Sequence, residues 1–114
     1  LINLQNLHLE NSNITDVTPL QTMTNLKNLK LLGNDIKNLY PLQALINLQN
    51  LWLSNNKLTD VTPLKALINL KELRLNRNRI SDITPLKNNN ITTGARFNNI
   101  THFCIFCCII FYSI

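Results

Sequence analysis

The residues best suited to metal chemistry lie close to the C-terminus, where one histidine and three cysteines share a short segment. His102 is followed by Cys104, Cys107 and Cys108. Thiolate and imidazole groups are the ligands that zinc prefers. One Cys-x-x-Cys pair without a second pair is a weak signal, and the bulky Phe and Ile residues between the ligands favour burial instead. We therefore predict no metal site in this segment.

A second group with metal-binding chemistry is a set of aspartates that recur in one register along the chain. They are Asp16, Asp60 and Asp82, with Asn38 in the same register. One carboxylate per repeat is too sparse for the multidentate oxygen cage that calcium requires. Such side chains also accept hydrogen bonds from the backbone that follows them. We predict local capping of the next turn, with no bound metal and no cofactor.

The groups that could act in catalysis do not form a set. The serine and histidine residues are Ser12, Ser54, Ser81, Ser113, His8 and His102. Their spacing gives no Ser–His–Asp arrangement, and no phosphate-binding, dinucleotide-binding or zinc-protease motif occurs. We predict no catalytic residue and no enzymatic activity.

All the candidate residues before residue 88 are set in a 22-residue repeat. Three leucine columns keep this period: Leu4, Leu26, Leu48 and Leu70; Leu7, Leu29, Leu51 and Leu73; and Leu9, Leu31, Leu53 and Leu75. A Pro-Leu pair follows in each unit, beginning at Pro19, Pro41, Pro63 and Pro85. The period never slips, so the sequence predicts four strand-bearing units.

Each unit holds one short strand, Leu7-His8-Leu9 in the first unit, whose alternation of apolar and polar residues predicts one buried face. A single unit cannot enclose its own apolar side chains, so the units must stack with their strands side by side in a parallel sheet. We expect Pro19 and its equivalents to end the segment after the strand, which leaves an extended or single-turn return arm.

Asparagine occupies the turn that follows the strand in three units. Asn34, Asn56 and Asn78 share one register, and the first unit has Ser12 there. A side-chain amide both donates and accepts hydrogen bonds. We predict that this column satisfies backbone groups of the turns that are removed from water, and that Ser12 does only part of this work.

The pattern Leu-x-x-Leu-x-Leu-x-x-Asn-x-Ile/Leu resembles the leucine-rich repeat, most clearly in residues 48–64. The 22-residue period and the Asp-Val/Ile-Thr-Pro-Leu ending are similar to the repeats of bacterial internalins. The leucine-rich regulatory subunit of protein phosphatase 1 has a similar repeat length but usually lacks the proline. The resemblance implies an α/β repeat solenoid: a right-handed superhelix with a short parallel sheet on its concave face and irregular or 3-10 return arms. Proteins of this kind use the concave face to hold another protein.

The positions that vary within this frame point away from the predicted core. The middle column of the strands is His8, Lys30, Trp52 and Arg74, and the following column is Glu10, Leu32, Ser54 and Asn76. We predict that these eight residues form the partner-binding surface. Trp and Arg are typical of binding hot spots, and the basic residues indicate a partner with an acidic surface. The alternative is that Trp52 only stacks on Lys30 and Arg74 in an ordinary solvated face.

The net charge gives little further indication of a partner. The whole chain carries a formal charge of +5, and without Lys87 and Arg96 nine basic and six acidic residues leave +3. This excess is too small and too scattered for a nucleic-acid interface. We interpret the chain as a monomeric, non-catalytic protein-binding module. The alternatives are spacer repeats in a longer array or a regulatory subunit of a signalling phosphatase. The sequence does not indicate the compartment.

Composition divides the chain into repeats at 1–87 and a different tail at 88–114. The tail holds all three Cys, no Leu and one charged residue, Arg96. Its apolar run from Phe103 to Tyr112 is too short for a bilayer core of about 30 Å. A membrane anchor, a metal site and a divergent cap are alternatives, but the abrupt loss of the repeat favours a shifted reading frame or a truncated gene. Since Leu1 lacks a preceding Met and begins mid-repeat, we expect a fragment.

Overall fold

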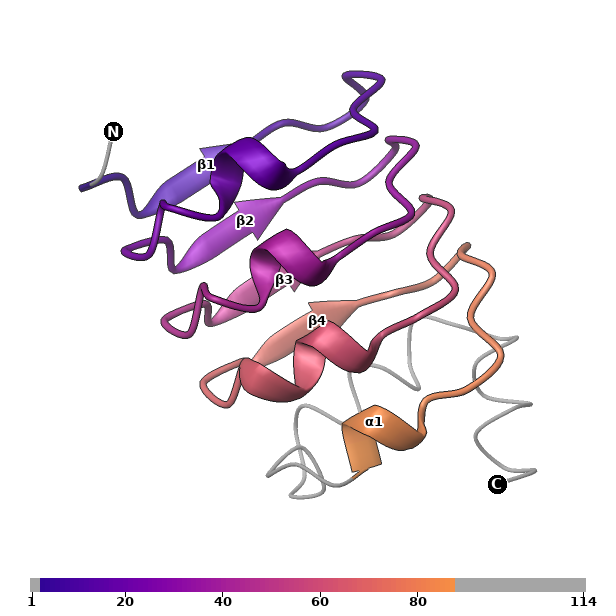
Figure 1. Ribbon diagram of the computed structural model, residues 1–114. Coiled ribbons are helices and arrows are strands. Elements are labelled where there is room, and N and C mark those ends of the chain that lie inside the picture. Colours follow the sequence, from indigo (N-terminus) through magenta and orange to yellow (C-terminus); the bar gives the residue numbers. More distant parts are fainter. Residues whose placement is uncertain (1–2, 88–114) are drawn as a thin grey trace.

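The computed structural model describes residues 3–87, which form one open parallel sheet with a short return arm after each strand (Figure 1). The strands are β1 (Asn6–His8), β2 (Asn28–Lys30), β3 (Asn50–Trp52) and β4 (Glu72–Arg74), in the spatial order β1-β2-β3-β4. The return arms carry the 3-10 turns η1 (Thr18–Leu20), η2 (Tyr40–Leu42) and η3 (Thr62–Ala66) and the helix α1 (Thr84–Lys87). The predicted α/β repeat solenoid is confirmed.

Neighbouring strands pair at the period of the sequence, without an offset. Leu7 lies opposite Leu29, Leu29 opposite Leu51, and Leu51 opposite Leu73. The backbone ladder continues past the strands, because the Leu9 N–H donates to the Lys30 carbonyl at 2.9 Å. Each column of the repeat is therefore a line of side chains across the sheet.

The core is the set of leucine columns, packed between the sheet and the return arms. Leu29, Leu51 and Leu73 are fully buried, as the stacking argument requires. In the first unit, on the edge strand β1, Leu7 and Leu9 are only partly buried, whereas Leu73 and Leu75 at the other edge are fully buried.

Proline has a second role in the return arm besides the one that the sequence suggested. Pro19, Pro41 and Pro63 lie in the first turn of η1, η2 and η3, so they begin these turns as well as ending the extended segment before them. The first residues of a helix have no intrahelical acceptor for their N–H groups, and proline has no N–H to leave unpaired. The short arms themselves agree with the prediction.

The turn after each strand uses a left-handed backbone at one repeat position. Asn11, Gly33, Asn55 and Arg77 have φ values of 53°, 72°, 60° and 59°. Glycine and asparagine adopt this conformation at low cost. The next residues in the last three units are Asn34, Asn56 and Asn78 of the asparagine column. The left-handed turn therefore directs their side-chain amides toward the interior of the solenoid.

Candidate functional site

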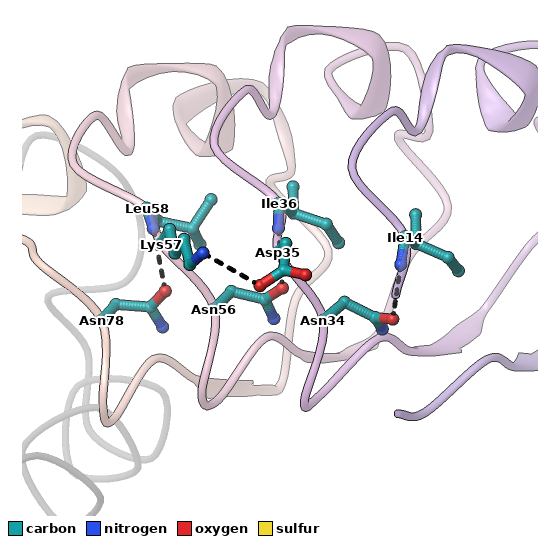
Figure 2. Close-up of polar contacts among 8 residues, drawn as sticks. All are labelled: Ile14, Asn34, Asp35, Ile36, Asn56, Lys57, Leu58 and Asn78. Carbon is teal, nitrogen blue, oxygen red and sulfur yellow. Dashed lines mark hydrogen bonds and ion pairs between the residues drawn. The ribbon is translucent and has the colours of Figure 1, made fainter. Parts of the chain in front are cut away.

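The asparagine column holds the turns of neighbouring repeats together (Figure 2). Asn56 is buried; its Oδ1 accepts the Ile36 N–H at 3.1 Å, and its Nδ2 donates to the Leu31 and Leu53 carbonyls at 3.0 and 3.1 Å. Asn34 and Asn78 make the equivalent bonds. The predicted role of this column is confirmed, and it is a role in the fold.

The first unit shows what the serine contributes. The Ser12 hydroxyl donates to the Glu10 carbonyl at 2.9 Å, within the same turn. Its backbone N–H donates to Oδ1 of Asn34, which also accepts the Ile14 N–H. Asn34 therefore supplies the bonds that reach the first turn from the second unit.

The aspartate column caps the return arms, as predicted. Oδ1 of Asp16, Asp60 and Asp82 accepts the backbone N–H two residues later at 2.8–2.9 Å, and Asn38 does the same for Tyr40 at 3.0 Å. Hydrogen bonds from the Thr18 hydroxyl and the Thr18 N–H lower the pKa of Asp16, and the same two groups of Thr62 lower the pKa of Asp60. Among residues 3–87 no His, Cys, Asp and Glu side chains gather in a group that could hold a metal.

These lowered pKa values give a pH prediction. Because a carboxylate with a lowered folded pKa stabilises the fold above its unfolded pKa, this stabilisation is lost as the pH falls below about 4. The double variant Asp16→Asn/Asp60→Asn should still cap its turns, as Asn38 does with an amide, but it should melt somewhat below the wild type at pH 7 because the neutral acceptor is weaker. Its melting temperature should fall less than that of the wild type between pH 5 and pH 2 in thermal melts.

Glu10→Gln is the control for that experiment, because it removes a carboxylate outside the capping column. It should keep the acid sensitivity of the wild type. If the melting temperatures of the wild type and the double variant fall by the same amount between pH 5 and pH 2, the capping account is contradicted.

The outward-pointing side chains of the sheet form the surface that we call the outer sheet face. Its middle column is His8, Lys30, Trp52 and Arg74, which the pairing of the strands places in consecutive register as predicted. Its preceding column is Asn6, Asn28, Asn50 and Glu72. The return arms lie on the other side of the sheet (Figure 1).

Trp52 lies between two cations. The Lys30 Nζ is 4.1 Å from the centroid of the indole ring, and the Arg74 Cζ is 3.7 Å from it. The stacking given as an alternative reading of Trp52 is thus present. Cation–π contacts at partly exposed sites contribute about 0.5–1 kcal/mol each. However, the indole Nε1 is buried and has no hydrogen-bond acceptor among the described residues, which costs free energy. The ring is therefore held by its two cations, while its N–H group remains unsatisfied within residues 3–87.

On β4, an ion pair joins the last residues of the middle and preceding columns. The Arg74 Nε lies 2.8 Å from Oε1 of Glu72, and both side chains are about one-third exposed. The other members of the preceding column form an amide ladder: the Asn28 Nδ2 donates to the Asn6 Oδ1, and the Asn50 Nδ2 donates to the Asn28 Oδ1. The binding-surface prediction left out this preceding column, although its spacing was visible in the sequence.

The outer sheet face is hollowed along these two columns. The depression has a volume of about 340 Å³, and its lining consists of Asn6, His8, Asn28, Lys30, Asn50, Trp52 and Glu72. Of the predicted site residues it brings together His8, Lys30 and Trp52.

The following column does not line this depression. Glu10, Leu32, Ser54 and Asn76 are all half-buried, so Leu32 is less exposed than the sequence argument assumed. The Ser54 hydroxyl donates to the Asn76 Oδ1. This bond links the segments that follow β3 and β4.

Two sequence predictions concern residues outside those described: the His102–Cys108 segment and the division at residue 88. Within residues 3–87, no helix is long and apolar enough to cross a membrane.

Comparison with known proteins agrees with this architecture. Residues 46–88 match the family of Leucine Rich repeats (2 copies). Internalin C2 of Listeria monocytogenes superimposes with a TM-score of 0.74 at 43% identity, over 75% of this chain and 38% of that chain. Internalin InlF of the same species has a TM-score of 0.74 at 35% identity, over 85% and 26%. The leucine-rich repeat protein LIC12759 of Leptospira interrogans has a TM-score of 0.62 at 35% identity, over 68% and 20%.

The chain thus spans between about a fifth and two-fifths of the length of these structures. No curated protein matches its sequence.

Proposed function

Because the chain is an internalin-like leucine-rich repeat protein, we propose that it is a protein-binding module that holds its partner on the outer sheet face. Leucine-rich repeat proteins, internalins included, generally mediate protein–protein interactions and are generally not enzymes. The finer statement, that this face is the site, rests on its own residues.

The observation that carries the proposal is the contrast between the two faces of each strand. The buried positions repeat leucine in every unit, whereas the middle outward column changes from His8 to Lys30, Trp52 and Arg74. Packing requires the leucines. Packing does not require Trp52, whose buried Nε1 lacks an acceptor within the described repeats.

The mechanism we propose is presentation on a rigid frame. Each strand is fixed by its neighbours through the backbone ladder and by the asparagine column in the turns that follow the strands. Side chains on such a frame lose little conformational freedom on binding, so more of the contact energy is available for affinity. Trp52 is further restricted by Lys30 and Arg74 on its two sides.

The test compares two aromatic-to-alanine variants of the whole chain in capture experiments from source-cell extract. Trp52→Ala should lose a partner that the wild type retains, with at least a tenfold loss of affinity when the purified partner is titrated. Tyr40→Ala is the matched control, because Tyr40 is 47% exposed and starts η2, on the other side of the sheet. It should bind like the wild type.

Circular dichroism of both variants separates binding from folding. If Trp52→Ala is folded and retains the same proteins as the wild type, the outer sheet face is not the site. The repeats would then be better explained as a spacer.

A further inference from the structure

Within the proposed function, we infer that the anion-binding centre of the outer sheet face is the Lys30–His8 end, and that it takes a carboxylate side chain of an acidic protein segment. Trp52 and Arg74, the residues that look most like a hot spot in the sequence, are on this account positioning groups. Three features of the face lead to this assignment.

The first feature is that both sides of the Trp52 ring are covered. Lys30 lies 4.1 Å from the ring centroid and Arg74 lies 3.7 Å from it. Since β2 and β4 flank β3, these cations approach from opposite sides of the strand. A partner cannot stack on a ring whose faces are both occupied. What it can meet is the cations that the ring holds in place.

The second feature is that, in the described repeats, a carboxylate neutralises the charge of Arg74 but not the charge of Lys30. The Arg74 guanidinium is paired with the Glu72 carboxylate at 2.8 Å. No ion pair of Lys30 is formed within residues 3–87. The pair Glu72–Arg74 sums to zero charge, so the net positive charge of the middle column rests on Lys30, with His8 beside it in register on β1.

The third feature is the chemistry around Lys30. Asn6 and Asn28 line the same depression as Lys30 and His8, and amide N–H groups are donors suited to a carboxylate. The carboxylate of the lining, Glu72, belongs to β4, two strands away from Lys30 on β2. An ammonium flanked by an imidazole and amides is a site for one anion, whereas the Arg74 end already holds its anion.

Trp52 is the single tryptophan of the chain, so its fluorescence reports directly on this face. The probe is a capped Glu-Gly-Glu-Gly-Glu peptide titrated into the full chain at low salt, with the Gln-containing peptide as its neutral counterpart. We expect the Glu peptide to change the Trp52 fluorescence saturably and the Gln peptide not to. We also expect the binding to weaken in 0.5 M salt.

Three variants assign the site. Lys30→Gln should lower the affinity for the Glu peptide about three- to fivefold, as expected for a partly exposed ion pair. Lys37→Gln removes the same charge from an exposed position outside the strands and should leave the affinity unchanged. Glu72→Gln should raise the affinity for the Glu peptide severalfold, because it removes the carboxylate that pairs with Arg74.

The inference is overturned if the Glu peptide does not bind, if Lys30→Gln and Lys37→Gln bind equally, or if Glu72→Gln has no effect. The outcome for the proposed function is read separately. A partner protein that is lost with Trp52→Ala but binds Lys30→Gln as tightly as the wild type would keep the outer sheet face as the site and reject the Lys30 centre.

Discussion

Replacing Asn56 with alanine is expected to lower the free energy of unfolding by about 3 kcal/mol or more. The Asn56 amide donates to the Leu31 and Leu53 carbonyls and accepts the Ile36 N–H, and the residue is only 7% exposed. Alanine leaves these backbone groups without partners in a place that water reaches poorly, and each buried unsatisfied group costs about 1–3 kcal/mol. Urea denaturation followed by circular dichroism measures the difference.

Two further variants make that experiment specific. Asn69→Ala removes an exposed asparagine that donates to the Ile46 carbonyl at 2.8 Å, and we expect it to cost less than about 1 kcal/mol. Asn56→Asp keeps the shape but turns a carboxylate oxygen toward carbonyl oxygens, so it should be at least as harmful as Asn56→Ala at pH 7. Equal stability of Asn56→Ala and Asn69→Ala would contradict the account of the column.

The second large effect is expected in the leucine core. Leu51→Ala should lower the free energy of unfolding by about 3–5 kcal/mol, the range for fully buried leucines that leave a cavity. Leu51 is 0% exposed, and its strand neighbours are Leu29 and Leu73, so neither side of the cavity can collapse without moving a β-strand. The same urea titration measures it.

Leu32→Ala is the matched control, since it makes the same chemical change at a half-buried position one residue after the buried Leu31. We expect it to cost less than about 1.5 kcal/mol, in proportion to the smaller area removed from contact. A loss as large as that of Leu51→Ala would mean that the outer sheet face takes part in the core.

Most of the fold could be predicted because a single period fixes several features at once. A 22-residue repeat that never slips places Leu7, Leu29 and Leu51 in one column. The same register brings Lys30, Trp52 and Arg74 side by side. The role of the proline in the return arm was predicted only in part, because proline can end an extended segment and begin a helical turn with the same backbone angle.

The electrostatics of the site were harder to predict. Register alone shows that Glu72 and Arg74 share one face of β4, but it does not show which neighbour a long side chain will choose. Arg74 contacts both the Trp52 ring and the Glu72 carboxylate. Rotamer choice decides such contacts, and it depends on packing in three dimensions.

The asparagine column has a direction that bears on the order in which the chain can be completed. Asn34 satisfies the Ser12 and Ile14 N–H groups of the unit before it, and Asn56 and Asn78 do the same for Ile36 and Leu58. A turn is therefore finished only when the next unit arrives. During synthesis from the N-terminus, each repeat leaving the ribosome would close the one made before it, and the most recent repeat would always be the least protected.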